Sequence, residues 1–184
     1  MARAAAAGVH LIQIREKDLG GAQLETVVRE AVSAVGGAAR VLVNDRLDVA
    51  LAAGAGGVHL GEASLPVERV ARWVREEVLR EFLVGASCHS LESALRAESE
   101  GADYIFFGPI FETPSKRAYG PPQGLERLGE VCRRVRIPVL AIGGITLDNA
   151  AACLASGASG LAAIRLFQDA EDLAATVAAL RACR

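Results

Sequence analysis

The sequence is poor in aromatic residues, in lysine and in long apolar runs. Aromatic residues make up 4% of the 184 residues, and Lys17 and Lys116 are the only lysines. No apolar run reaches the roughly 20 residues that a membrane helix needs, and no hydrophobic signal region follows Met1. The formal net charge of -2 lacks the basic excess that nucleic acids and anionic membranes attract. We therefore expect a cytoplasmic protein that binds neither nucleic acid nor membranes, with an oligomeric state that the sequence leaves open.

Paired cysteines are also absent. No Cys-x-x-Cys spacing occurs among Cys88, Cys132, Cys153 and Cys183, so we expect neither disulfides nor a structural zinc site. What the chain does have is a large hydrophobic fraction, 52% of its residues. This is enough for a core that folds unaided, and we expect residues 1–184 to form one domain.

Short apolar runs of strand length alternate with amphipathic stretches rich in alanine, leucine, arginine and glutamate. This alternation is typical of repeated βα units around a parallel sheet. The predicted strands span residues 9–15, 40–45, 57–61, 83–88, 104–109, 138–143 and 160–166. The predicted helices span residues 23–35, 46–53, 66–80, 90–100, 125–135, 148–156 and 169–182.

Local signals support these boundaries. Ser90 and Thr146 are of the type that caps the first turn of a helix, and Gly54, Gly101 and Gly157 follow three predicted helices, where a left-handed turn returns the chain to a strand. The near-even spacing of seven units favours an α/β fold of the (β/α)8 TIM-barrel type that lacks the first βα unit. Residues 1–8 resemble the last turn of a helix. Either the true start lies upstream or the barrel is open along one seam; an open doubly wound sheet is the competing architecture.

Catalytic groups in such barrels lie where strands end, so polar residues there are the first candidates. Strand alternation places Gln13 and Arg15 on one face, and with Lys17 they form a cationic group suited to a diphosphate. The simpler alternative is a solvated turn in which Glu16 forms an ion pair.

Two further strand ends carry polar side chains. Asn44 and Asp45 follow a buried-looking run, and a carboxylate beside an amide suits Mg²⁺ that also binds substrate phosphates. Their alternative role is to cap the next helix. Ser87 is either a ligand contact or a cap. Of the histidines, His10 and His59 are expected in the core. His89 lies nearer the carboxyl ends of the predicted strands, and its role is open.

Candidate functional segments also follow the last three predicted strands. Residues 108–124 form a long loop of glycine, proline, hydroxyl groups and Lys116, a composition that favours function and suggests a lid. Gly143 and Gly144 follow one strand and Ile164 and Arg165 the next. Counting the missing unit, these are strands seven and eight, whose loops bind phosphate in many barrels.

Taken together and in order, these segments resemble the thiamine-phosphate synthase and thiazole tautomerase family, and more closely the synthases. The resemblance covers residues 13–166 and includes Gln-x-Arg-x-Lys, Asn-Asp, Val-His-Leu-Gly, Phe-Gly-Pro-Ile-Phe-x-Thr-Pro-Ser-Lys and Ile-Gly-Gly-Ile. It implies a (β/α)8 barrel that joins hydroxymethylpyrimidine diphosphate to hydroxyethylthiazole phosphate and releases diphosphate. The implied partners are these phosphorylated small molecules, and the implied cofactor is Mg²⁺.

The resemblance also implies roles for individual residues. The catalytic cations would be Arg15, Lys17 and Lys116, which stabilise the departing diphosphate, and Asp45 would bind Mg²⁺. The pyrimidine diphosphate would be held by Gln13, Arg15, Lys17, Asn44, Ser87 and Lys116. The thiazole phosphate would be held by Thr113, Pro114, Ser115, Gly143, Gly144, Ile164 and Arg165.

The chain departs from the synthase pattern in three places. Ser64 stands where the synthases have a second metal-binding aspartate, with Glu62 as the other candidate ligand. Arg165 stands where a serine contacts phosphate, and the first strand is missing. Two alternatives to a synthase follow: a thiazole tautomerase, which works without metal, and a truncated, non-catalytic relative that binds a phosphorylated ligand.

Overall fold

The computed structural model describes residues 1–77, 81–113 and 121–183. Its strands form a single seven-stranded sheet in which spatial order follows chain order, and every neighbouring pair is parallel. The strands are β1 (Leu11–Ile14), β2 (Arg40–Asn44), β3 (Gly57–Leu60), β4 (Leu83–Cys88), β5 (Tyr104–Phe107), β6 (Val139–Ile142) and β7 (Gly160–Ala162).

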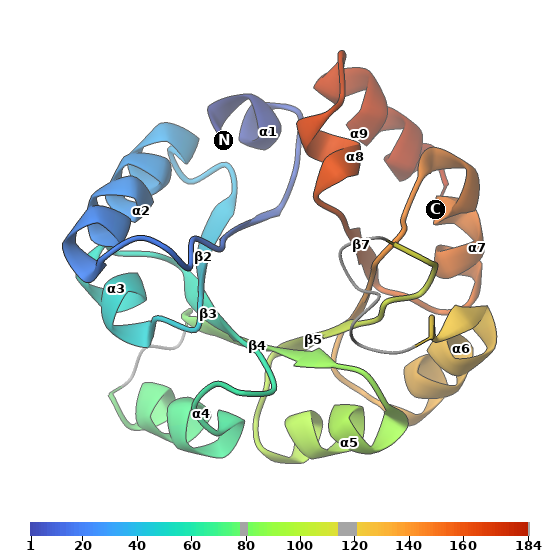
Figure 1. Ribbon diagram of the computed structural model, residues 1–184, viewed down its shortest axis with the longest axis horizontal. Coiled ribbons are helices and arrows are strands. Elements are labelled where there is room, and N and C mark those ends of the chain that lie inside the picture. The colour runs from blue at the N-terminus through green and yellow to red at the C-terminus, as the bar shows by residue number, and fades with distance from the viewer. Residues whose placement is uncertain (78–80, 114–120, 184) are drawn as a thin grey trace.

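Helices surround the curled sheet as an outer ring (Figure 1). They are α1 (Ala2–Ala6), α2 (Gly21–Val35), α3 (Leu47–Ala52), α4 (Val67–Glu76), α5 (Leu91–Ser99), α6 (Gly124–Arg134), α7 (Leu147–Ala155), α8 (Arg165–Gln168) and α9 (Leu173–Ala182). A doubly wound sheet reverses its strand order and carries helices on both faces. The sequential order and the single outer ring exclude that alternative, and the predicted TIM-barrel-like fold is confirmed.

The sheet is open between β1 and β7, which are its two edge strands in the described part of the chain. Helices bridge this seam: α1 lies beside α9 (Figure 1), and Arg181 Nη2 of α9 donates a hydrogen bond to the carbonyl oxygen of Gly8 over 3.0 Å. The helical turn predicted for residues 1–8 is therefore confirmed as α1. It contributes to the outer ring at the point where the strand ladder is interrupted.

Alternating side chains of the strands pack on two sides of the sheet, as expected for a parallel sheet that is buried on both faces. Val43, Val58 and Val84 pack outward beneath the helices. Tyr104 and Phe106 project into the interior of the ring with Leu42.

Most predicted elements are present, with shorter ends. Gly54, Gly101 and Gly157 all adopt the left-handed conformation predicted for them. The last predicted strand, residues 160–166, is partly wrong: β7 ends at Ala162 and α8 begins at Arg165. A short apolar run such as this one fits a strand and a buried helix equally well, so periodicity alone could not separate them. None of the helices within the described ranges has the length and hydropathy needed to cross a membrane.

Candidate active site

A row of hydrogen-bonded side chains crosses the carboxyl ends of β1 and β2. Gln13 Nε2 donates to Asn44 Oδ1 over 2.8 Å, and Asn44 Nδ2 donates to Asp45 Oδ2 over 2.7 Å. All three residues are half-buried. The amide of Asn44 is therefore fixed in one orientation, and it connects the end of β1 to the carboxylate that follows β2.

Asp45 turns its carboxylate toward the end of β3. Its φ of 62° is left-handed, a conformation in which aspartate and asparagine are enriched among non-glycine residues. Asp45 Oδ1 accepts hydrogen bonds from the Gly61 amide over 3.2 Å and from the Ser64 hydroxyl. The alternative of a helix cap is wrong, because α3 has Arg46 at its N-cap and no side-chain cap bond.

This arrangement offers oxygen ligands to a hard cation. One carboxylate, Asp45, and one hydroxyl, Ser64, lie in contact, whereas Glu62 is exposed and has no bond to either of them. No cluster of three or more His, Cys, Asp or Glu side chains occurs within the ranges that the structure describes. These donors fit Mg²⁺ that takes most of its ligands from water and substrate phosphates, and they do not fit a metal held by protein alone.

Ser87, on the inner face of β4, is bonded to the interior of the ring. Its hydroxyl lies 2.9 Å from His59 Nε2, and His59 Nδ1 lies 2.9 Å from Tyr104 Oη. Burial raises the pKa of Tyr104 well above its ordinary value, and the charge of Asp103 raises it further, so the phenol keeps its proton. Ser87 does not cap α5, because Ser90 Oγ accepts the Ser93 amide there over 3.1 Å.

Of the two histidines predicted to lie in the core, one does and one does not. His59 is buried in the core, as expected, but His10 is exposed and the prediction of a core position for it is wrong. His10 lies just before β1, outside the strand, so alternation along the strand does not apply to it. His89 Nδ1 is hydrogen-bonded to the carbonyl oxygen of Gly108, which places it beside the end of β5.

The turn after β6 is built from backbone. Gly143 and Gly144 have φ values of 96° and 69°, and a Cβ at Gly143 would lie 2.6 Å from Pro109 Cα. A Cβ at Gly144 would lie 2.7 Å from Phe111 Cβ. The Phe111 amide donates to the Gly143 carbonyl over 3.0 Å, so the segment after β5 is packed directly on the glycine turn.

A family model and two sequence relatives indicate one family. Residues 1–167 match the family model described as thiamine monophosphate synthase. The chain belongs to this family. The thiamine-phosphate synthase of Methanocella arvoryzae is 44% identical over 98% of this chain and 84% of the relative, and that of Methanoculleus marisnigri is 45% identical over 97% and 83%.

A solved structure supports the same assignment. Thiamine phosphate pyrophosphorylase from Pyrococcus furiosus superimposes with a TM-score of 0.83 at 36% identity, covering 99% of this chain and 86% of that one. The prediction of a thiamine monophosphate synthase family member is confirmed. Its enzymes are transferases, and the tautomerase alternative finds no support among these relatives.

The structure places the other predicted residues around the same end of the sheet. Arg15 and Lys17 are exposed just after β1, and the salt bridges within the described ranges do not include Glu16. Ile164 and Arg165 are exposed after β7, and Thr113 is buried. Pro114, Ser115 and Lys116 lie outside the described residues.

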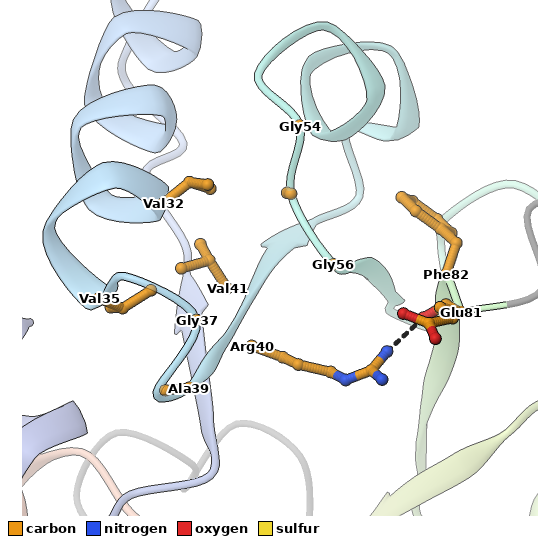
Figure 2. Close-up of a pocket in the computed structure, with 11 residues that line it drawn as sticks. Val32, Val35, Gly37, Ala39, Arg40, Val41, Gly54, Gly56, Glu81 and Phe82 are labelled. Atoms are coloured by element: carbon orange, nitrogen blue, oxygen red, sulfur yellow. Dashed lines mark hydrogen bonds between the residues drawn. The ribbon is translucent and has the colours of Figure 1, made fainter.

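A cavity of about 650 Å³ lies at the opposite end of the sheet (Figure 2). It is lined by Val41 at the start of β2, by Gly56 just before β3 and by Phe82 just before β4, and the Arg40 guanidinium donates to the carbonyl oxygen of Glu81 at its edge. None of the residues predicted to bind substrate lines it. Because active sites of these barrels lie at the carboxyl ends of the strands, this cavity is separate from the candidate site.

The residues that lie behind Ser87 in the candidate site do not stand out in the sequence. His59 and Tyr104 were not proposed as functional, although both alternate with residues that pack outward, Val58 beside His59 and Ile105 beside Tyr104. A polar side chain on the inward face of an apolar strand was the available signal. Cys88, next to Ser87, is buried, which raises the pKa of its thiol to about 11 and leaves it protonated and unreactive near neutral pH.

Proposed function

We propose that this chain is a thiamine-phosphate synthase that joins hydroxymethylpyrimidine diphosphate to hydroxyethylthiazole phosphate. The observation that carries the proposal is the hydrogen-bonded row Gln13, Asn44, Asp45 and Ser64 at the carboxyl ends of the first strands. It presents oriented amide and carboxylate groups at the end of the sheet that also carries the Gly143–Gly144 turn. Family membership and the names of the relatives support the same reaction.

The reaction breaks the bond between the pyrimidine methylene carbon and a diphosphate oxygen, and forms a bond from that carbon to the thiazole nitrogen. Negative charge grows on the departing diphosphate. Arg15 and Lys17, exposed at the end of β1, would bind this charge together with Lys116, and preplaced cations stabilise such a transition state. No covalent enzyme nucleophile is required.

Neutral groups would orient the pyrimidine substrate. Gln13 and Asn44 are already locked to each other, so they bind without losing much side-chain freedom. Ser87 would add a hydroxyl contact to the diphosphate. Mg²⁺, when bound, would be held by Asp45 with Ser64 beside it, and would neutralise diphosphate charge.

The thiazole phosphate would lie against the other side of the rim. Backbone amides of Gly143 and Gly144 would bind its phosphate with Ile164 and Arg165, since exposed N–H groups at such turns attract anions. Thr113, Pro114 and Ser115 would complete this side. Holding the thiazole nitrogen next to the forming pyrimidine cation converts a bimolecular step into a local one, which is a large part of catalysis.

One observation favours thiazole tautomerase as a second candidate. In the bonded row formed by Gln13, Asn44, Asp45 and Ser64, Asp45 is the single carboxylate. Ser64, which contacts it, stands where the synthases have a second metal-binding aspartate. The tautomerase reaction moves protons within a thiazole carboxylate phosphate and needs no metal. Dependence on metal therefore separates the two reactions.

The test supplies both synthase substrates to the purified chain and measures diphosphate release with and without Mg²⁺. We expect release that requires Mg²⁺, and an Arg15→Ala variant whose kcat/KM falls about 100-fold because one cation beside the leaving group is lost. Arg29→Ala on α2 is the matched control, since this arginine is exposed and pairs with Glu25 away from the site. Folded protein that binds the substrates without turnover would overturn the proposal. In a second assay that supplies the thiazole carboxylate phosphate instead, isomerisation in the presence of EDTA would establish the tautomerase.

A further inference from the structure

A chain of hydrogen bonds runs from the interior of the ring to Ser87. His59 is 1% exposed, and its two ring nitrogens contact Tyr104 Oη and Ser87 Oγ, each over 2.9 Å. We propose that His59, held by Tyr104, is a positioning residue that fixes the direction in which Ser87 donates its hydroxyl proton to the diphosphate substrate. This inference rests on the proposed function, because it assigns a role within the same site.

The direction of each bond follows from the donors available. Within ranges 1–77, 81–113 and 121–183, His59 is the only hydrogen-bond partner of Tyr104 Oη. A buried O–H left without an acceptor costs more than a buried oxygen with one unused lone pair. The Tyr104 hydroxyl therefore donates to Nδ1, and this fixes the neutral ring with its proton on Nε2.

The consequence reaches Ser87. With its proton on Nε2, His59 donates to Ser87 Oγ, so the serine oxygen is an acceptor in that bond. Ser87 Oγ has no second hydrogen-bond partner in the described part of the chain. Its own O–H is then left to donate to an acceptor outside the protein, which is what a diphosphate oxygen supplies. With the opposite tautomer, Ser87 would donate inward to Nε2 and present only lone pairs to an anion.

The packing keeps this arrangement rigid. Asn44, His59, Gly85 and Tyr104 are register partners across β2 to β5, and the His59 ring lies 4.3 Å from the Phe106 ring between centroids. A Cβ at Gly85 would lie 2.1 Å from Tyr104 Cζ, so only glycine at this point of β4 leaves room for the phenol. The phenol that contacts His59 Nδ1 is consequently packed tightly against β4, on the face where the His59 ring also contacts Phe106.

The first test reads the tautomer directly and does not depend on activity. The chain has three histidines, His10, His59 and His89, so nitrogen–proton correlation spectra of uniformly ¹⁵N-labelled protein resolve each ring. We expect His59 to carry its proton on Nε2, and Tyr104→Phe to weaken this preference. A His59 proton on Nδ1 in the wild-type protein would overturn the proposal, whether or not the chain is a synthase.

The second test is a double-mutant cycle with Tyr104→Phe and Ser87→Ala. Tyr104→Phe should lower kcat/KM for the pyrimidine diphosphate roughly tenfold, as expected for a weakened hydrogen bond to a charged group, with KM for the thiazole phosphate unchanged. In the Ser87→Ala background the same substitution should change nothing further, because Tyr104 acts on the substrate only through His59 and Ser87. His10→Gln is the control: it replaces an exposed histidine and should leave kcat/KM unchanged.

Two outcomes would contradict the positioning role. A KM for the thiazole phosphate that rises as much as the KM for the pyrimidine diphosphate, or losses of Tyr104→Phe and Ser87→Ala that simply add, would mean that Tyr104 acts only through packing. If no variant and no wild-type protein turns over, the proposed function fails, yet the tautomer measured by magnetic resonance still decides the hydrogen-bond direction.

Discussion

The two halves of the candidate site, at the carboxyl ends of β1 to β4 and of β5 to β7, are built from different chemical groups. Along β1 to β4 the site consists of side chains that bond to one another, from Gln13 through Asn44 to Asp45, with Ser87 tied to His59. Along β5 to β7 it consists mainly of backbone, where Gly143 and Gly144 are pressed against the segment after β5. Substitutions along β1 to β4 can therefore change the charge of the candidate site. Substitutions at Gly143 or Gly144 would instead collide with the segment after β5.

This contrast fits the two anions of the proposed reaction. The diphosphate leaves during the reaction, and its growing charge needs cations and a carboxylate that can share a metal. The thiazole phosphate stays bound through the step, so the rigid turn at Gly143 and Gly144 would be sufficient for it. If this division is correct, the two sides should fail in different ways when they are altered.

The largest effect is expected on the backbone side. Gly143→Ala adds a methyl group 2.6 Å from Pro109 Cα at a φ of 96°, so both a clash with backbone and a strained conformation result. We expect a loss of about 3 kcal/mol in the free energy of unfolding, together with a higher KM for the thiazole phosphate. Urea unfolding and steady-state kinetics measure the two effects.

Gly36→Ala is the control for this prediction. Gly36 also has a positive φ, 54°, but nothing lies within 4 Å of its Cβ position. It should lose only about 1 kcal/mol, the cost of the left-handed conformation for alanine. Equal losses in the two variants would mean that the turn after β6 is not tightly packed.

The next effect is expected on the side-chain side. Asp45→Asn keeps a residue type that tolerates the φ of 62° but removes the negative charge. We expect kcat/KM to fall about 100-fold with little change in the unfolding midpoint, because a charged ligand is lost and the shape is retained. Mg²⁺ titrations of activity would show the loss as a higher half-saturating concentration.

Asp48→Asn is the matched control, since Asp48 lies on α3 and pairs with the exposed Arg46. It should leave activity and its Mg²⁺ dependence unchanged. If Asp45→Asn behaved in the same way, the carboxylate would serve only to orient Asn44 and the Gly61 amide.

The sequence predicts the side-chain half of the rim better than the backbone half. Gln13, Asn44 and Asp45 stand at strand ends with recognisable chemistry, and register alone brings the ends of neighbouring parallel strands together. The order and number of the strands follow for the same reason, because each βα unit repeats one pattern. By contrast, Gly143 is only half of a common dipeptide until its contact with Pro109 is seen.

Long-range contacts explain what the sequence does not reveal. The bond between His59 and Tyr104 joins residues 45 positions apart, and no local pattern specifies which inward side chains meet in the middle of a ring. The Asp45 carboxylate likewise contacts the Gly61 amide and the Ser64 hydroxyl, which are 16 and 19 positions further along the chain. The end of β7 was predicted too late because Leu161 to Leu166 suits either element.

The smallest effect tests whether a second charge can be added to the side-chain half. Ser64 contacts Asp45 Oδ1, so Ser64→Asp would place two carboxylates side by side. Without metal they repel, and the thermal midpoint should fall; with Mg²⁺ the pair gains a shared cation, and the midpoint should recover. We expect the half-saturating Mg²⁺ concentration for activity to fall about tenfold, the effect of one added anionic ligand.

Ser64→Asn, which adds similar bulk without charge, should not show the Mg²⁺-dependent recovery. If Ser64→Asp were no more sensitive to Mg²⁺ than Ser64→Asn, the metal would not bind between β2 and β3, and the diphosphate charge would be neutralised by Arg15, Lys17 and Lys116 alone.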